Sequence, residues 1–228
     1  MKIGVLLAGC GVYDGSEIHE AVFTLLAIDE HGADAVCMAP DEEQHHVIDH
    51  RSGDEMDEKR NVLTESARIA RGDIQPLSEV NLNELDALVV PGGFGAAKNL
   101  NKWALSGPDG DILPEVKNTI LEFVKAKKPI TGLCMGPTVI AKALEGSGVH
   151  ATLTVGSTAA ESPYDIAGIS QGMESIGTRT SMRTLQEVEV DGKNLIVSAP
   201  CYMMEGSITE VRNNVKMAID QMMELLKK

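Results

Sequence analysis

The sequence predicts an α/β fold in which a mostly parallel β-sheet is covered by helices on both faces. Short continuous apolar runs alternate with stretches of helical periodicity, and glycine-rich turns follow several of the runs. Continuous apolar runs are typical of strands buried on both faces. A chain of 228 residues with 43% hydrophobic residues can also bury a sizeable core. We expect a single domain over residues 1–228.

The first elements form a predicted βαβ unit. Ile3–Leu7 is a continuous apolar run, and a glycine-rich turn follows it. Ser16 is a candidate N-cap for a helix over residues 17–31, whose apolar positions recur at helical spacing. A second strand is predicted over Ala35–Met38, which ends just before Pro40.

Residues 41–77 interrupt this alternation, and we expect an insertion here rather than a domain. The stretch is polar and has helical periodicity only around residues 61–71. It contains His45, His46 and His50, which could bind a metal ion. A polar surface loop is the favoured explanation, so we expect no metal site.

The alternation then resumes to the end of the chain. Residues 157–183 are polar and glycine-punctuated, and their pattern indicates only partial helix. An Asp-Gly pair between two apolar runs predicts a hairpin near the end. The predicted strands cover residues 85–90, 129–133, 153–155, 188–190 and 195–197, and the predicted helices cover residues 113–127, 135–144 and 207–226.

The charge balance argues against nucleic acid as a partner. The chain has 34 acidic and 20 basic residues and a formal net charge of −14. The densest basic cluster, Lys125, Lys127 and Lys128, lies at the end of a predicted helix, where cations suit the helix dipole. A protein this negative repels phosphate backbones.

We expect a reduced, cytoplasmic protein without a membrane partner. The apolar run after Lys2 is too short for a signal peptide or a membrane span, although a mature organelle-matrix form would look the same. Four scattered cysteines without a C-x-x-C pair indicate neither a disulfide framework nor a zinc site. Cys10 and Cys201 fall at predicted strand ends, where we expect them to pack in the core or at its rim.

The most informative motif is GLCMGP, residues 132–137. A buried strand, one cysteine flanked by glycines and a following helix form the cysteine version of the nucleophile elbow. The amides and dipole of the helix N-terminus would stabilise a thiolate. We therefore interpret Cys134 as an exposed, largely ionised nucleophile. The alternative is a buried structural cysteine at a strand end.

A second glycine motif, PGGFG, directly follows the predicted strand over residues 85–90. Adjacent glycines let backbone amides approach a ligand and point at developing negative charge. Loops at the carboxyl ends of parallel strands form the binding crevice of an open sheet. We expect amides near Gly92, Gly93 and Met135 to form an oxyanion hole, with an ordinary tight turn as the alternative.

Two carboxylates accompany these motifs. Glu17 and Glu20 lie three residues apart on the first predicted helix, on nearly one face. A thiolate and a carboxylate about 3 Å apart at an effective dielectric near 20 repel by roughly 5 kcal/mol, so both cannot stay ionised. A glutamic acid in contact with Cys134 should therefore keep its proton, whereas a carboxylate placed for the helix dipole is the simpler alternative.

Histidines are poorly placed for a hydrolytic Cys–His dyad. The segment after the last predicted strand, SAPCYMMEG, contains none, and His150 is expected at the opposite edge of the sheet. His19 is the best-placed histidine and is a candidate substrate-binding residue, with a solvated helix position as the alternative.

Three segments resemble the ElbB-type glyoxalases, also called the enhancing lycopene biosynthesis protein family. They are AGCGVYDGSEIHEAVFTLLAI at residues 8–28, MDEKRNVLTESARIARGDI at residues 56–74 and LDALVVPGGFGAAKNL at residues 85–100. The similarity covers essentially the whole chain and is most specific in the first hundred residues. It also indicates the PfpI-like superfamily, which is related to class I glutamine amidotransferases.

The resemblance implies a flavodoxin-like three-layer sandwich with its elbow at Cys134 and an amide pair at Gly92 and Gly93. Superfamily members commonly place a glutamate a dozen residues before the glycine that ends the first helix. That position here is Glu20, while Glu17 remains possible. The resemblance also implies a homodimer without the amidotransferase triad, a link to isoprenoid metabolism, and conversion of glyoxal or methylglyoxal to hydroxy acids without cofactor.

These observations lead to a hypothesis and its alternatives. We expect a cofactor-independent, glyoxalase-like lyase in which Cys134 forms a hemithioacetal with a small α-oxoaldehyde while Glu20 or Glu17 moves a proton. The alternative is a redox-sensing or regulatory scaffold without catalysis, in which Cys134 is oxidised. Glutaminase action for a synthase partner would require a histidine that the sequence does not place.

Overall fold

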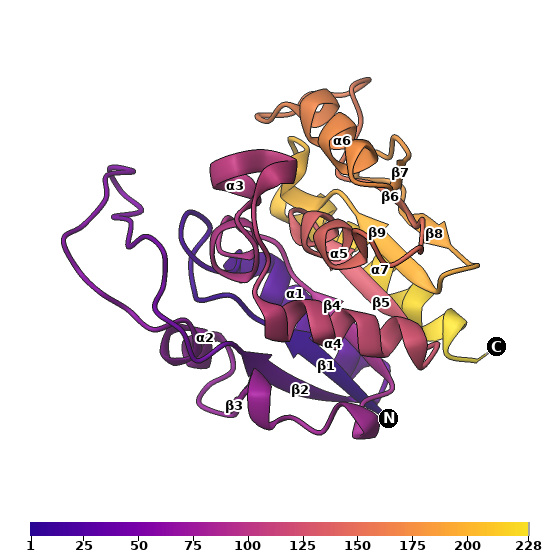
Figure 1. Cartoon of the computed structure of the whole chain (residues 1–228), viewed down its shortest axis with the longest axis horizontal. Coiled ribbons are helices and arrows are strands. Elements are labelled where there is room, and N and C mark those ends of the chain that lie inside the picture. Colours follow the sequence, from indigo (N-terminus) through magenta and orange to yellow (C-terminus); the bar gives the residue numbers. More distant parts are fainter. Residues whose placement is uncertain (228) are drawn as a thin grey trace.

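The computed structural model describes residues 1–227 and has a seven-stranded sheet at its centre (Figure 1). The strand order is β3-β2-β1-β4-β5-β9-β8, and all neighbouring strands are parallel except β8 and β9. This confirms the predicted mostly parallel α/β fold. The strands are β1 (Lys2–Leu6), β2 (Asp34–Ala39), β3 (Gln75–Pro76), β4 (Ala87–Val90), β5 (Ile130–Leu133), β8 (Glu189–Asp191) and β9 (Ile196–Ala199).

Helices cover both faces of this sheet. α1 and α7 pack against each other on one face, and α4 and α5 form a pair on the other (Figure 1). The helices are α1 (Ile18–Glu30), α2 (Val62–Ile69), α3 (Trp103–Ser106), α4 (Pro114–Lys125), α5 (Gly136–Leu144), α6 (Ile166–Ser175) and α7 (Ile208–Leu225). Short helical turns cover Leu77–Glu79, Leu82–Glu84, Ala96–Leu100, Gly107–Asp109 and Cys201–Met203. Within residues 1–227, no helix has the length and apolar character needed to cross a membrane.

The core lies between the sheet and its two helical layers. The central strands β4 and β5 are buried along their whole length, and β1 is buried from its second residue. Each apolar side chain therefore meets a helix on one face or the other. This explains why these strands are continuous apolar runs rather than alternating ones.

The start of α1 differs from the prediction. The helix begins at Ile18, and its N-cap is Glu17, whose side chain accepts a hydrogen bond from the Glu20 amide at 2.7 Å. Ser16, the predicted N-cap, instead accepts a hydrogen bond from the Ala8 amide at 2.9 Å. Its hydroxyl therefore fixes the loop to the end of β1, and the carboxylate next to it takes over the capping role.

The strand predicted over residues 153–155 lies outside the main sheet. β6 (Thr152–Leu153) pairs only with β7 (Arg179–Thr180), in a separate two-stranded sheet. With α6 it forms a small unit beside the β9–β8 edge (Figure 1). Apolar character indicates burial but not the partner strand, so the sequence pattern could not distinguish the two sheets.

Residues 41–61 form a long loop that projects at the left of Figure 1. A buried asparagine, Asn99, ties this loop to the body: its Oδ1 accepts from the His45 amide at 2.9 Å. Its Nδ2 donates to the carbonyls of Ala8 and Asp14, each at 2.9 Å. Asn99 therefore joins three segments that surround the carboxyl end of β1.

We predict that Asn99→Ala lowers the free energy of unfolding by about 2–4 kcal/mol, because it leaves one partly buried amide and two buried carbonyls without partners. Urea denaturation followed by circular dichroism measures this difference. Asn83→Ala is the control, because Asn83 is exposed and its side chain has no protein partner in the described part of the chain. A loss for Asn99→Ala no larger than for the control would contradict the assigned role.

Candidate active site

The chain turns sharply at Cys134, between β5 and α5. Its φ of 54° lies in the left-handed region, which costs a non-glycine residue about 1–3 kcal/mol. Its amide donates to the carbonyl of Ala199 in the neighbouring β9, at 2.9 Å, and this bond holds the turn in register with the sheet. The residue is only 5% exposed. The elbow therefore presents its sulfur to a nearly closed site.

Glu20 on α1 lies against this sulfur and is fully buried. Its carboxyl shares a hydrogen bond with the Cys134 thiol. Its two oxygens accept hydrogen bonds from the amides of Gly92 and Tyr202, each at 3.1 Å. One carboxyl thus joins α1 to the loops that follow β4, β5 and β9.

The close approach requires glycine at position 92. A Cβ there would lie 2.3 Å from the Cys134 Cβ and 2.6 Å from Oε2 of Glu20, which is closer than real atoms pack. Gly93 has a φ of 92°, so it also favours glycine. The amides of Gly93 and Met135 point at the Cys134 sulfur. The two glycines therefore let backbone donors reach the thiol.

The carboxyl of Glu20 holds a proton at neutral pH. Burial is the main reason that the pKa of Glu20 rises to about 8, and the negative charge of Glu17 adds to the rise. The amides of Tyr202 and Gly92 and the Cys134 thiol partly oppose it. This agrees with the expectation that the carboxyl and the sulfur cannot both be ionised.

The expectation of an exposed, largely ionised thiol is wrong. Burial, together with the charge of Glu20, raises the pKa of the Cys134 thiol. The amides of Gly93 and Met135 act in the opposite direction but do not reverse the shift. The spacing of the glycines indicated the elbow. It could not indicate that Cys134 is buried, because the burial is produced by segments that are distant in the sequence. The resting site therefore holds a thiol.

Glu17 and His19 lie at the edge of the site. The Glu17 side chain caps α1, and burial raises its pKa. Nδ1 of the exposed His19 lies 2.8 Å from the Tyr202 hydroxyl and 4.0 Å from a Glu17 oxygen. Of the two candidate glutamates, only Glu20 contacts Cys134.

A cavity of about 400 Å³ opens beside the pair. This volume is within the usual range for small-ligand sites. Two half-buried tyrosines in its wall were not identified from the sequence. Tyr202 lies five residues after the last predicted strand, a position that could have indicated it, whereas Tyr164 lies in the segment whose pattern indicated little. The lining residues are Val12, Tyr13, Glu17, His19, Pro163, Tyr164, Tyr202, Met204, Glu205 and Gly206.

The other candidate residues lie apart from Cys134, with one exception. Cys201 is fully buried, and burial is the main reason that the pKa of its thiol is raised, with smaller contributions from the charges of Glu20 and Cys134. Cys10 is half-buried beside Glu65. His150 bonds through Nδ1 to the Gly177 carbonyl at 2.6 Å, in the unit formed by β6, β7 and α6.

No metal site is found among the residues that the structure describes, where no three potential ligands gather. The rings of His45 and His46 lie 4.3 Å apart. His50 accepts a hydrogen bond from the Tyr13 amide at 3.2 Å. The three histidines thus occupy the projecting loop without converging on one point.

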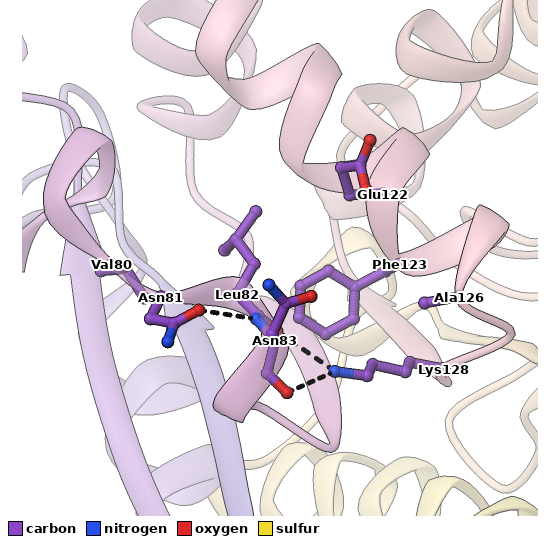
Figure 2. Close-up of a pocket in the computed structure, with 8 residues that line it drawn as sticks. All are labelled: Val80, Asn81, Leu82, Asn83, Glu122, Phe123, Ala126 and Lys128. Atoms are coloured by element: carbon purple, nitrogen blue, oxygen red, sulfur yellow. Dashed lines mark hydrogen bonds between the residues drawn. The ribbon is translucent and has the colours of Figure 1, made fainter.

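A second cavity, of about 290 Å³, lies between the segment before β4 and the end of α4 (Figure 2). Its residues precede β4 and β5, so it is at the amino ends of these strands, away from the elbow. Its one cation, Lys128, already donates to the carbonyls of Leu82 and Asn83. The geometry gives it no link to the chemistry at Cys134.

The fold and the cysteine elbow together define a class I glutamine amidotransferase-like domain. The chain is 40% identical over 228 residues to the ES1 protein homolog, mitochondrial, of Rattus norvegicus, an alignment that covers 98% of this chain and 84% of that protein. It is also 40% identical to the human glutamine amidotransferase-like class 1 domain-containing protein 3, mitochondrial, covering 98% of this chain and 83% of that protein. The chain belongs to this family of glutamine amidotransferase-like class 1 proteins. No family model matches it.

Solved structures agree with this assignment. A crystal structure of an isoprenoid biosynthesis protein with amidotransferase-like domain from Ehrlichia chaffeensis superposes with a TM-score of 0.89 at 34% identity, covering 99% of both chains. DJ-1beta of Drosophila melanogaster superposes with a TM-score of 0.57 at 15% identity, covering 99% of this chain and 95% of that one. The second likeness concerns the fold alone.

We predict that Glu20→Gln flattens the pH dependence of stability. The folded pKa of about 8 exceeds the ordinary value of 4.5, so the folded state binds more protons than the unfolded state between these pH values. The free energy of unfolding therefore falls as pH rises, by about 5 kcal/mol over this window from this group. Urea denaturation at several pH values from 5 to 8 measures the slope.

The exposed Glu79 provides the matched control. Glu79→Gln removes the same charge at the other end of the sheet and should leave the wild-type slope unchanged. An equal slope in wild type and Glu20→Gln would show that Glu20 is ionised in the folded protein across the window.

Proposed function

We propose that the protein is a cofactor-independent, glyoxalase-like enzyme that converts small α-oxoaldehydes to hydroxy acids through Cys134. One observation carries the proposal: a buried carboxyl contacts the elbow sulfur while two amides point at it. This arrangement supplies a nucleophile, a proton carrier and oxyanion donors in one place. The resemblance to the ElbB-type glyoxalases supports the same reaction.

The first step forms a hemithioacetal. The Glu20 carboxylate accepts the thiol proton as the Cys134 sulfur bonds to the aldehyde carbon, and the carbonyl π-electrons move to oxygen. The resulting oxyanion receives hydrogen bonds from the amides of Gly93 and Met135, which lie beside the sulfur. Glu20 then returns the proton to that oxygen. Because the thiol pKa is raised, this transfer is essential for attack.

The second step is an internal proton transfer. Glu20 takes the proton from the carbon bonded to sulfur, which gives an enediolate, and delivers it to the neighbouring carbon. The proton of the hydroxyl on the first carbon passes to the oxygen of the second, so that a carbonyl forms next to sulfur. The product is a thioester of the hydroxy acid on Cys134. Water cleaves this thioester and restores the thiol, so glyoxal and one water yield glycolate and one proton. No external oxidant or reductant enters the balance.

The relatives bear on location and biological setting. The rat and human relatives are named as mitochondrial, which supports an organelle-matrix protein rather than the expected cytoplasmic one. The Ehrlichia protein is named for isoprenoid biosynthesis, so we extend this setting to the present chain as part of the proposal. A homodimer remains a prediction that rests on the resemblance.

We predict that wild-type protein converts glyoxal to glycolate and that Cys134→Ala does not, because the variant lacks the bond-forming sulfur. Glu20→Gln should lose at least about a hundredfold in turnover, since it removes the proton carrier. Proton NMR of glycolate formation measures both, with Glu79→Gln as an active control. Equal turnover by wild type and Cys134→Ala would refute the proposal.

The scaffold alternative predicts a different outcome. Wild type would then show no turnover, and mild peroxide would convert the Cys134 sulfur selectively to a sulfinate, as detected by mass spectrometry.

We predict that kcat/KM rises by about tenfold per pH unit below pH 8 and levels off above it. The reason is that only the Glu20 carboxylate can accept the thiol proton, and the pKa of Glu20 is about 8. Initial rates with methylglyoxal between pH 6 and 9, corrected for the reaction without enzyme, measure the profile. A flat profile would contradict Glu20 as the base.

A further inference from the structure

The cavity beside Glu20 and Cys134 has an unusual charge pattern for its ten lining residues. Two are glutamates, Glu17 and Glu205, and none is lysine or arginine. From this pattern we infer that Glu205 and Glu17 determine specificity by excluding anionic reactants, so that the site takes carbonyl compounds that are uncharged or positively charged. This inference deepens the proposed function and names the reactant class of the same site.

Glu205 places a carboxylate at the cavity rim. The residue is exposed, and its amide donates to the Glu161 carbonyl at 3.0 Å, which fixes the backbone there. No cation forms an ion pair with it among residues 1–227. The Glu205 charge therefore faces the solvent and the cavity without a counter-ion.

Lys98 contacts one lining residue, Tyr13, but is not itself part of the cavity lining. Nζ of Lys98 donates to the Tyr13 carbonyl at 2.9 Å and lies 5.5 Å from the centre of the Phe94 ring. The carboxylates that act on its pKa are Asp14 and Glu55, although burial is the larger influence. Lys98 thus lies behind the cavity wall rather than in its lining.

Three tyrosine side chains also belong to the cavity lining. Tyr13, Tyr164 and Tyr202 all line the cavity, and ring faces attract cations. Burial raises the pKa of Tyr164 to about 12, and the charges of Cys134 and Glu20 contribute next. Its hydroxyl therefore stays neutral. An anionic group in this cavity would meet two carboxylates, and the one lining residue that can become cationic, His19, already lies 4.0 Å from a Glu17 oxygen.

The size of the discrimination follows from Coulomb's law. One charge at roughly 7 Å, in a dielectric between about 40 and 80, changes an encounter rate by about three- to sevenfold. Two carboxylates should therefore make a cationic reagent faster than an anionic one by at least about tenfold, relative to a free thiol. Salt should reduce this ratio, because the cavity is open to solvent.

The test uses two thiol reagents of similar size and opposite charge, 2-aminoethyl and 2-sulfonatoethyl methanethiosulfonate. Each transfers its thioalkyl group to the Cys134 sulfur, forming a disulfide and releasing methanesulfinate. Peptide mapping by mass spectrometry follows modification of Cys134, and 2-mercaptoethanol gives the intrinsic ratio of the two rates. Because removing one carboxylate slows the cationic reagent and speeds the anionic one, we expect the normalised ratio to fall by about seven- to fiftyfold in Glu205→Gln and further in Glu205→Lys.

Glu79→Gln is the matched control, because it removes one negative charge far from the cavity and should keep the wild-type ratio. Circular dichroism checks that the Glu205 variants fold. Any of three results would overturn the inference. The normalised ratio could be near one in the wild type, it could be equal in the wild type and Glu205→Gln, or Cys134 could react with neither reagent.

Turnover separates this inference from the proposed function. 4,5-Dioxopentanoate carries the same α-oxoaldehyde group as methylglyoxal together with a carboxylate, and it should be a poorer substrate than methylglyoxal, with the gap narrowing in Glu205→Gln. If no aldehyde turns over but the reagent ratio depends on Glu205, the proposed reaction fails and the charge selection stands. If methylglyoxal turns over and the reagent ratio does not depend on Glu205, the proposed reaction stands and the charge selection fails.

Discussion

The burial of one carboxyl against one thiol is the constraint on which the site depends. Two acidic groups in contact inside a dry pocket cannot both lose their protons, so the pair must hold at least one of them. The oxygens of Glu20 accept hydrogen bonds from the amides of Gly92 and Tyr202, and its carboxyl contacts the Cys134 thiol. These contacts orient the carboxyl towards the sulfur, and they also make the pair costly for the fold.

The topology of the sheet explains how four distant segments reach this point. The strand order reverses direction between β1 and β4, so α1 and α4 lie on opposite faces of the sheet. A crevice forms outside the carboxyl ends of the strands at such a switch point. Glu20 comes from the helix after β1, and the glycine loop, the elbow and Tyr202 follow β4, β5 and β9. Every reacting group is thus within a short distance of a strand end in the sequence.

This closeness to strand ends determines what the sequence could predict. The main strands and Cys134 were recognisable because continuous apolar runs and flanking glycines are local signals. The pairing of β6 with β7 was not, because it depends on which distant edge is free. The protonated state of Cys134 was missed for the same reason, since burial is produced by segments remote in sequence. Tyr164 lies in a region without periodicity, so nothing local indicated its place.

The acidic surroundings of the site have two effects with one physical cause. Negative charge near the pair opposes any further negative charge, whether it arises by loss of a proton from Glu20 or arrives on a reactant. The charge of Glu17 contributes to the raised pKa of Glu20, and Glu17 and Glu205 both line the cavity beside the pair. The negative charge around the site therefore helps to keep Glu20 protonated. It also limits which reactants can enter the cavity. A neutral dicarbonyl satisfies both conditions, because it adds no charge until its oxygen meets the amides beside Cys134.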